Sequence, residues 1–347
     1  MTGAERSVAL IGFGLAGSVF HAPLIAATPG LTLTTIVTAD PKRAARARNE
    51  HPGARVEPDA DAVWDRAAEH DLAVVATANQ AHAELASRAI DAGLAVVVDK
   101  PLAPTAAEAR ALVEQAARRG TVLTVFHNRR WDSDQLTLRR LLAEDRLGGV
   151  HRYESRFERW RPQPRPGAWR ETTPPERGGG VLLDLGTHLV DQALVLFGPV
   201  TAVHGEVDSR RGGVADDDAF IALTHESGVH SHLWASSVAA APGPRLRVLG
   251  SEAAYVVDVV DGQEDALARG EHPGAGPEWG VEPPERWGRL VRGDESEPAP
   301  SEPGGWPRFY VELEAALRGG GPPPVDPADA VTVLELLERA RRSPERP

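Results

Sequence analysis

The chain has 347 residues, and its 38 Lys and Arg against 50 Asp and Glu give a formal net charge of −12. This acidic balance argues against a general nucleic-acid binder, because such proteins concentrate basic charge to displace counterions from phosphates. The sequence contains no cysteine, which excludes disulfides, thiolate metal sites and a cysteine nucleophile.

The first third of the chain alternates short β-branched runs with helical patterns, which is typical of βαβ units and a parallel sheet. Unbroken apolar runs such as LAVVATA and LAVVV indicate strands buried on both faces. We therefore predict an α/β protein that begins with a doubly wound Rossmann domain over residues 1–127. The predicted strands are Ser7–Ile11, Leu31–Thr38, Ala54–Val56, Leu72–Thr77, Ala95–Val98 and Thr121–Phe126, and the predicted helices are Leu15–Thr28, Pro41–Glu50, Gln80–Gly93 and Thr105–Arg119.

The pattern changes after about residue 127. A helix is predicted over Asp134–Leu147, and the later runs alternate polar and apolar residues, as antiparallel strands with one covered face do. Residues 262–308 are rich in Pro, Gly and Glu, but their tryptophans predict a packed irregular excursion. The second domain, residues 128–347, is therefore predicted to be α+β. Its predicted strands lie in 150–160, 219–227, 229–237 and 244–258, its excursion contains Trp279, Trp287 and Trp306, and a last helix begins after Asp326.

A glycine-rich stretch, Gly12-Phe13-Gly14-Leu15-Ala16-Gly17, follows the first predicted strand and opens the first predicted helix. In this setting glycines allow a tight turn, close approach of the backbone to a pyrophosphate and close helix packing, while the helix N-terminus offers N–H donors to the anion. The alternative is a glycine-rich turn without a ligand. The position directly after a strand favours a dinucleotide site.

Asp40 comes 23 residues after Gly17, close to the spacing of roughly 20 expected for an acidic residue on the ribose 2′-hydroxyl, which favours NAD. Against this, Lys42 and Arg43 are near enough in the sequence to meet a 2′-phosphate. Asp40 and Pro41 also fit the cap and first residue of a helix. The expected cofactor is NAD(P), with NAD slightly favoured.

Lys42 and Lys100 are the only lysines in the chain. A lysine can shift its pKa and give up a proton, whereas an arginine stays charged. Lys100 stands within Asp99-Lys100-Pro101 at the carboxyl end of a buried strand, where open parallel sheets bind ligands. It is therefore a candidate catalytic residue, with a surface lysine in a turn as the alternative.

Asp184 and His188 lie in a helical pattern that follows three consecutive glycines, Gly178–Gly180. Their spacing places both on one helical face, with Cβ atoms roughly 5 to 6 Å apart. An acid beside a histidine can orient the ring and tune its pKa toward neutrality, which suits a proton acceptor. The alternative is a solvated or core pair, but the nucleotide loop elsewhere in the chain favours a functional role.

Two further clusters have a structural and a functional interpretation. His225, His230 and His232 include an H-x-H pair that could bind a metal, but exposed strand residues are preferred because a metal site needs more ligands. No metal is therefore predicted. The stretch Phe126–Asp132 stands at the end of the nucleotide domain, where polar and aromatic groups suit a polyhydroxylated substrate. A plain linker is the alternative.

Several ordered motifs together resemble the dehydrogenase family of glucose-fructose oxidoreductase, inositol dehydrogenase and rhizopine catabolism. The finer details SVFH, HNRRWDSD and DLGTHLVDQ are most similar to its NADP-dependent scyllo-inositol dehydrogenase branch. The resemblance implies that the second domain contains an open, mainly antiparallel sheet, with a substrate face and an oligomer interface, so we expect a homodimer or homotetramer. The motifs are GFGLAGSVFHAPL from residue 12, TANQAHAELASRAIDAG from 77, DKP from 99, HNRRWD from 127 and GGGVLLDLGTHLVDQ from 178.

By position, the resemblance implies that Lys100 is the catalytic lysine, Asp184 its acidic partner and His188 the proton acceptor. Asp99 replaces the family's usual glutamate and is one methylene shorter. In the branch named above an arginine tends to occupy the position of Asp40, so the NADP preference is not carried over. The expected cofactor-binding residues are Gly12, Phe13, Gly14, Leu15, Ala16, Gly17, Thr38, Asp40, Arg43, Thr77, Asn79, His82, Asp99 and Lys100, and the expected substrate-binding residues are Asn128, Arg129, Trp131, Arg165, Trp169, Asp184 and His188.

The expected reaction is the reversible oxidation of a secondary alcohol on a cyclic polyol or sugar, with His188 accepting the hydroxyl proton and Lys100 stabilising the oxygen. Lys100 and His188 should then converge beside the bound coenzyme. The alternatives are an NAD-dependent glycoside hydrolase of the same fold and a non-catalytic cofactor-binding regulator. No nucleic-acid or membrane partner is expected. No apolar stretch approaches the roughly 20 residues of a membrane span, and the start of the chain lacks a signal-peptide layout, so we expect a cytoplasmic protein.

Overall fold

The computed structural model describes residues 5–165, 167–273 and 278–342, and the chain divides into two compact units. The first unit consists of residues 1–127, 263–279 and 306–331, and the second of residues 128–262, 280–305 and 332–347. The sequence predicted one continuous division, into 1–127 and 128–347. The chain instead returns twice to the first unit.

Aromatic side chains explain why the returning segments belong to the first unit. Trp306 is fully buried, and its ring meets that of Phe20 edge to face, with 5.7 Å between the ring centroids. Phe309 packs on Phe126 in the same way at 4.9 Å, and the Gln263 side chain accepts a hydrogen bond from the Trp306 backbone N–H at 2.9 Å. Burial of such rings removes a large apolar surface from water. No local pattern reveals these contacts, because the partner rings lie far apart in the chain.

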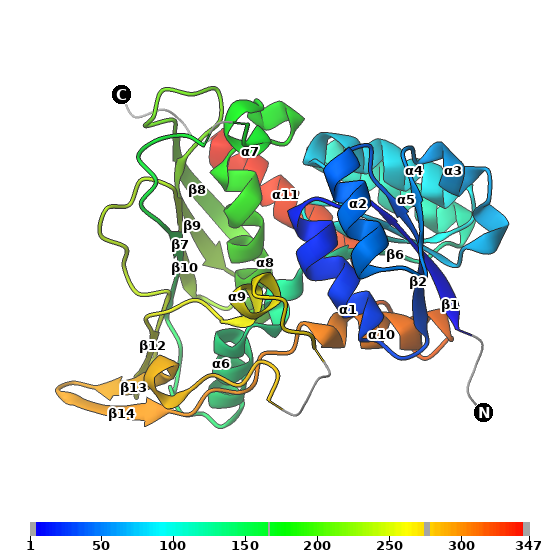
Figure 1. The fold of residues 1–347 in the computed structure, drawn as a ribbon. Coiled ribbons are helices and arrows are strands. Elements are labelled where there is room, and N and C mark those ends of the chain that lie inside the picture. Colours follow the sequence, from blue (N-terminus) through cyan, green and yellow to red (C-terminus); the bar gives the residue numbers. More distant parts are fainter. Residues whose placement is uncertain (1–4, 166, 274–277, 343–347) are drawn as a thin grey trace. The chain divides into compact units, whose positions relative to one another are not determined.

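The sheet of the first unit has the strand order β3-β2-β1-β4-β5-β6, and every pairing in it is parallel. The chain winds from β1 toward β3 and from β4 in the opposite direction toward β6, so right-handed crossovers place helices on both faces of the sheet (Figure 1). The predicted doubly wound domain is confirmed. Its strands are β1 (Arg6–Ile11), β2 (Leu31–Val37), β3 (Arg55–Glu57), β4 (Leu72–Val75), β5 (Ala95–Asp99) and β6 (Leu123–Phe126).

The helix that connects β5 and β6 begins and ends at residues with the expected capping chemistry. The Thr105 side chain accepts a hydrogen bond from the Glu108 backbone N–H in a capping box, and Gly120 ends the same helix with φ at +66°. No helix in the described part of the chain combines the length and apolar character that a membrane span requires. The helices are α1 (Ala22–Ala26), α2 (Pro41–Glu50), α3 (Asp61–Trp64), α4 (His82–Asp91), α5 (Ala106–Arg119), α9 (Gln263–Ala268) and α10 (Pro307–Leu317).

The predicted helix over Leu15–Thr28 differs in its winding. Residues Ala16–His21 form a π-helical turn, and regular α-helix is present only in α1. Pro23 has no N–H, so it cannot continue an α-helical ladder that starts before it. The wider π-helical turn precedes this interruption.

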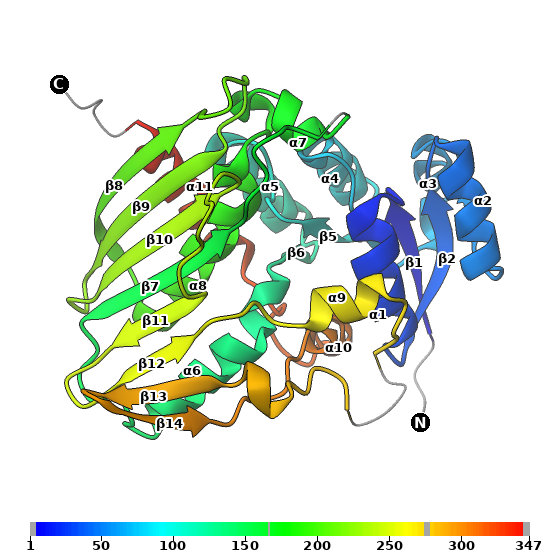
Figure 2. The same ribbon diagram turned by 60° about the vertical axis from the view of Figure 1, so that its left-hand side comes forward.

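The second unit contains an eight-stranded sheet in the order β14-β13-β12-β11-β7-β10-β9-β8 (Figure 2). Only the pairing of β7 with β10 is parallel. Buried and partly exposed residues alternate along β9 and β10, so one face of the sheet is covered and the other is open. The predicted α+β unit with an open, mainly antiparallel sheet is confirmed. The elements are β7 (Arg152–Glu158), β8 (Val200–Asp208), β9 (Asp218–His225), β10 (His230–Ser236), β11 (Leu246–Leu249), β12 (Ala254–Val257), β13 (Gly288–Arg292), β14 (Glu295–Ala299), α6 (Ser133–Ala143), α7 (Trp169–Thr172) and α8 (Thr187–Phe197), while α11 (Pro327–Arg341) has residues in both units.

Three parts of the chain differ from the sequence prediction. No strand was predicted at β8, and the single predicted run over 244–258 forms two strands, β11 and β12, joined by a turn. The stretch 262–308 is packed as predicted but not irregular, because it contains α9 and the hairpin of β13 and β14; residues 274–277 of it lie outside the described part. β14 is an edge strand that contains Pro298, and edge strands tolerate the polar residues and proline that obscure a strand pattern.

Candidate active site

The predicted cofactor-binding residues of the first unit lie at the carboxyl ends of four parallel strands. The glycine loop follows β1, Thr38 and Asp40 follow β2, Thr77 and Asn79 follow β4, and Asp99 is the last residue of β5. β1 and β4 are neighbours from which the chain winds in opposite directions. This edge is therefore the topological switch point, where open parallel sheets bind their ligands.

The three glycines of the first loop differ in what the fold requires of them. Gly12 has a φ of +104°, and a Cβ atom there would lie 2.4 Å from the Ala76 carbonyl oxygen. A Cβ atom on Gly17 would lie 2.0 Å from the Gly12 carbonyl oxygen, whereas one on Gly14 would meet only Arg43 Nη1, at 3.7 Å. Packing accounts for Gly12 and Gly17. The room at Gly14 fits a backbone that a pyrophosphate approaches closely.

Asp40 is the N-cap of α2. Its Oδ1 accepts hydrogen bonds from the backbone N–H groups of Lys42 and Arg43, both at 2.9 Å. The bond from Arg43 holds the pKa of Asp40 below its ordinary value, so the carboxylate is ionised at neutral pH. The structure thus shows the capping interaction that the sequence left open as one alternative. Asp40 remains exposed at the edge where the ribose is expected.

Two arginines of α2 lie against the glycine loop. A Cβ atom on Gly14 would meet Arg43, which was among the predicted cofactor-binding residues. Arg46, which was not predicted, donates to Ser18 Oγ at 3.2 Å and lies 5.9 Å from the centroid of the Phe13 ring. Their spacing of three residues places both on one face of the helix. They bring positive charge to the edge where a phosphate would bind.

His82 connects the loops that follow β4 and β5. Its Nδ1 donates to the Pro101 carbonyl oxygen at 2.7 Å, and its Nε2 lies 3.3 Å from the Thr77 carbonyl oxygen. The ring is fully buried, and the neighbouring Asn79 is also buried. His82 therefore fixes the turn after Lys100 to the loop that carries Thr77 and Asn79.

A buried row of polar groups anchors the turn that carries Lys100. Asp99 Oδ1 accepts a hydrogen bond from the Lys100 backbone N–H at 2.9 Å and lies 3.8 Å from His21 Nε2. His21 Nδ1 lies 2.7 Å from the Tyr310 hydroxyl oxygen. Burial acts to raise the pKa of Asp99, but the contact with the His21 ring outweighs it and lowers the pKa. The short aspartate side chain is therefore held as an anion beneath Lys100.

In the second unit, Asp184 and His188 lie on consecutive turns of one helical segment. Asp184 is in a π-helical turn over Leu182–Gly186, and His188 is in the first turn of α8. His188 is 5% exposed, and its ring centroid lies 6.1 Å from that of Phe157. π-helical turns are rare and occur frequently at functional sites.

The glycines before this segment allow close packing. Gly180 has a φ of +94°, and a Cβ atom there would lie 2.0 Å from Asp216 Oδ2. Asp216 Oδ1 in turn accepts a hydrogen bond from the Leu182 backbone N–H at 2.7 Å. The start of the segment with Asp184 is thus fixed to Asp216.

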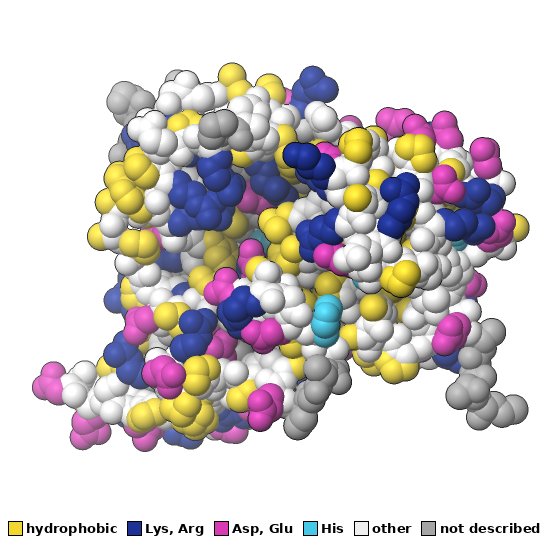
Figure 3. Space-filling model, viewed as in Figure 1, with side chains coloured by type: hydrophobic (Ala, Val, Ile, Leu, Met, Phe, Trp, Pro, Cys, Tyr) yellow, Lys and Arg dark blue, Asp and Glu magenta, His cyan; other side chains and the backbone are white. Residues whose placement is uncertain are grey.

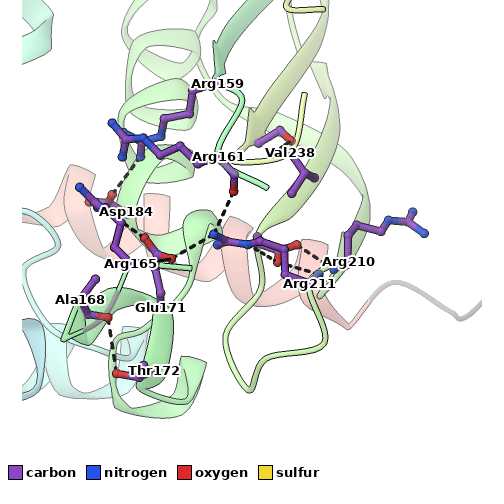
Figure 4. A network of polar contacts seen from close by, with 12 residues as sticks. Arg159, Arg161, Arg165, Ala168, Glu171, Thr172, Asp184, Arg210, Arg211 and Val238 are labelled. Carbon is purple, nitrogen blue, oxygen red and sulfur yellow. Dashed lines mark hydrogen bonds and ion pairs between the residues drawn. The ribbon is translucent and has the colours of Figure 1, made fainter. Parts of the chain in front are cut away.

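The sequence did not predict the ion pairs of Asp184. Arg170 Nε lies 3.1 Å from Asp184 Oδ1, and Arg159 Nη2 lies 3.8 Å from Asp184 Oδ2 (Figure 4). Trp169, a predicted substrate residue, begins α7 and lies 4.5 Å beneath the Arg170 guanidinium. Arg165, another predicted substrate residue, is exposed and pairs with an acid of α7. The signal in the sequence was the density of arginines in this segment.

Three other predicted substrate residues, Asn128, Arg129 and Trp131, lie in a 3-10 turn and are buried. The Arg129 guanidinium lies 4.8 Å from the centroid of the Phe157 ring. His188 contacts the same ring, so the structure brings Arg129 and His188 to one aromatic side chain. Lys100 belongs to the first unit and His188 to the second, and their convergence stays a prediction.

His225 is in β9, and His230 and His232 are in β10. His225 Nδ1 donates to the Gly198 carbonyl oxygen at 2.8 Å, and its Nε2 lies 2.8 Å from Ser231 Oγ. Within residues 5–165, 167–273 and 278–342, no group of three or more His, Asp and Glu is placed to hold a metal ion. These hydrogen bonds account for the burial of His225.

Comparison with known proteins places both units in one family. Residues 6–127 match the oxidoreductase family with an NAD-binding Rossmann fold, and residues 135–256 match the GFO/IDH/MocA C-terminal domain. The uncharacterized oxidoreductase YdgJ of Escherichia coli is 40% identical over 95% of this chain and 94% of its own. The scyllo-inositol 2-dehydrogenase (NADP(+)) IolW of Bacillus subtilis is 33% identical over 97% of this chain and 93% of its own. The solved structure of YvaA from Bacillus subtilis has a TM-score of 0.90 and 32% identity, covering 98% of this chain and 96% of that one.

Proposed function

Because the chain belongs to the GFO/IDH/MocA family of NAD(P)-dependent oxidoreductases, we propose that it oxidises a secondary alcohol of a cyclic polyol or sugar to a ketone. The observation that carries this proposal is the glycine loop at the β1 and β4 edge, where the backbone at Gly14 is left open for a dinucleotide. The similarity to a scyllo-inositol dehydrogenase supports an inositol-like substrate.

We assign the proton transfer to His188. Its ring is almost fully buried, and a neutral imidazole is a suitable acceptor for the hydroxyl proton near neutral pH. Asp184 lies one helical turn earlier. Its ion pairs with Arg159 and Arg170 orient these side chains around the substrate. Lys100 donates a hydrogen bond to the substrate oxygen and stabilises its developing negative charge. The nicotinamide, when bound, supplies the hydride acceptor.

The cofactor-binding roles follow the strand ends. The loop from Gly12 to Gly17 would hold the pyrophosphate, Thr38 and Asp40 the adenosine ribose, and Thr77, Asn79 and Asp99 the nicotinamide end. The ionised carboxylate of Asp40 repels a 2′-phosphate, whereas Arg43 attracts one. We propose that the protein slightly favours NAD over NADP as its cofactor.

A substrate panel tests the reaction. Inositols and neutral sugars are each supplied with NAD and with NADP, and the absorbance of reduced nicotinamide is followed. We expect net formation of reduced cofactor with at least one cyclic polyol or sugar. Glycoside cleavage without net reduction would favour the hydrolase alternative, and cofactor binding without turnover across the panel would favour a regulator.

A further inference from the structure

We infer that the substrate carries an anionic group, a carboxylate or a phosphate, and that Arg161 and Arg159 bind this group beside Asp184. The inference rests on the proposed function and narrows the substrate class of the same site. It is carried by an excess of guanidinium groups around Asp184, in a chain whose net charge is −12.

The excess of arginines over acids is visible in the sequence before Asp184. Residues 159–177 lead to the glycines before Asp184. This segment has a net positive charge, whereas the net charge of the whole chain is negative. Figure 3 shows basic side chains gathered on the second unit. The segment contains the arginines Arg159, Arg161, Arg165, Arg170 and Arg177 but only the acids Glu171 and Glu176.

Glu171, one of the two acids of this segment, is already paired with arginines. Glu171 Oε1 lies 3.1 Å from Arg165 Nε, and Glu171 Oε2 accepts a hydrogen bond from Arg211 Nη1 at 3.0 Å (Figure 4). Arg211 also donates to Asp217 Oδ2 at 2.8 Å. Asp184 has two guanidinium partners of its own, Arg170 and Arg159.

The Arg161 side chain is not paired with an acid in the described part of the chain. In the described part of the chain its guanidinium group takes part in no ion pair and no hydrogen bond, although the side chain is only partly exposed. Its backbone is held firmly, because its N–H donates to the Ser237 carbonyl oxygen at 2.8 Å and its carbonyl oxygen accepts from Arg211 Nη1 at 3.2 Å. The structure therefore positions a guanidinium group for a partner from outside the protein.

Arg159 and Arg161 are placed to act together. The backbone N–H groups of Arg159 and Arg161 donate to the carbonyl oxygens of Ser236 and Ser237, at the end of β10. Side chains two residues apart on an extended chain lie on the same face, roughly 7 Å apart. Figure 4 shows both side chains extending from the strand in one direction, and the Arg159 guanidinium is paired with Asp184.

The chemistry of the pair favours an anion over a hydroxyl group. Guanidinium groups bind carboxylate and phosphate through parallel hydrogen bonds, and they are weakly hydrated, so they release water readily. A neutral polyol would leave the positive charge beside Asp184 uncompensated. A sugar acid or a phosphorylated polyol would balance it.

Matched pairs of substrates test the inference. Glucose is compared with glucuronate and glucose 6-phosphate, and myo-inositol with myo-inositol 1-phosphate, each with NAD and NADP. We expect kcat/KM to be about 10- to 100-fold higher for one anionic member than for its neutral counterpart, which is the size expected for hydrogen bonds to a charged group. The carboxylate and phosphate members distinguish the two sources of charge.

Variants then locate the effect. Arg161→Gln is expected to lower kcat/KM for the anionic substrate much more than for the neutral one, and Arg161→Lys is expected to restore part of the difference. Arg152→Gln is the matched control, since it removes one exposed arginine at the opposite end of β7, roughly 30 Å along the extended chain from Arg161. Melting temperatures of the variants separate loss of binding from loss of folding.

Calorimetric titration with the same anionic compounds keeps the two proposals distinguishable. Binding that depends on Arg161 without oxidation would support the anion site and overturn the proposed reaction. Oxidation of neutral polyols with no gain from a charged group, or an equal loss for both substrates in Arg161→Gln, would overturn the anion site and leave the reaction standing. If no compound is bound and none is oxidised, both proposals are overturned.

Discussion

At the scale of single residues, the carboxylate of Asp40 serves the fold and faces the expected cofactor edge. A serine at this position can still cap α2 but carries no charge. We expect Asp40→Ser to raise kcat/KM with NADP relative to NAD about tenfold, because the repulsion between the Asp40 carboxylate and the 2′-phosphate is removed. The melting temperature should change little. Steady-state kinetics with both cofactors measures the ratio.

Asp59 provides the control for this substitution. It is also an exposed aspartate that accepts a hydrogen bond from a nearby backbone N–H, that of Asp61 at 2.9 Å. Asp59→Ser should leave the cofactor ratio unchanged. An unchanged ratio in Asp40→Ser as well would show that Asp40 acts only as a helix cap.

His188 is the residue on which the proposed proton transfer depends. His188→Ala should lower turnover by roughly 10² to 10⁴, the usual contribution of a general base. Cofactor affinity should persist, because the glycine loop belongs to a different unit. Turnover is measured with the substrate found in the panel, and cofactor binding by nicotinamide fluorescence. His230→Ala, a substitution of an exposed histidine on β10, is the control, and wild-type turnover in His188→Ala would contradict the assignment.

At the scale of elements, the glycine loop separates the demands of packing from those of binding. A Cβ atom at position 17 would lie 2.0 Å from the Gly12 carbonyl oxygen, so Gly17→Ala should lower the free energy of unfolding by about 1 to 3 kcal/mol. Gly14→Ala has room for its methyl group and should fold with nearly unchanged stability, but with weaker cofactor binding. Denaturant unfolding and cofactor titration of both variants measure the two effects. Weaker folding with intact cofactor binding in Gly14→Ala would contradict this division.

At the scale of the whole molecule, four histidines with lowered pKa values link folding to pH. Burial is the main cause of the lowered pKa of His51, His70, His225 and His232. Between these values and the ordinary value of 6.5 the unfolded chain binds more protons than the folded one. The contribution of these neutral histidines to the free energy of unfolding is therefore complete above pH 6.5, and it is lost as the pH falls below this value.

We expect the melting temperature to decrease between about pH 7.5 and pH 5.5, before most carboxylates titrate. Calorimetry across this range measures the decrease. His225→Gln removes one of the contributing groups and should flatten the profile, whereas His230→Gln changes an exposed ring. A melting temperature that is constant over the range would contradict the linkage between folding and pH.

The assembly into a homodimer or homotetramer stays a prediction.

The sequence predicted the features that depend on local order. Apolar runs and the glycine loop predicted the parallel sheet, and the spacing of Asp184 and His188 predicted a shared helical segment. Such patterns repeat with the period of one strand or one helix, so neighbours in the chain are sufficient to reveal them. The many arginines before Asp184 are also visible in the sequence. Which of them pair with acids depends on the fold.

Only the tertiary structure decided what each of these residues meets. It brought Trp306 and Phe309 back to the first unit, added β13 and β14 to the edge of the second sheet, and paired Glu171 with Arg211. These contacts join positions that are distant in the chain, and their free energy comes from burial and charge pairing after folding. A sequence pattern of fixed period carries no record of such partners.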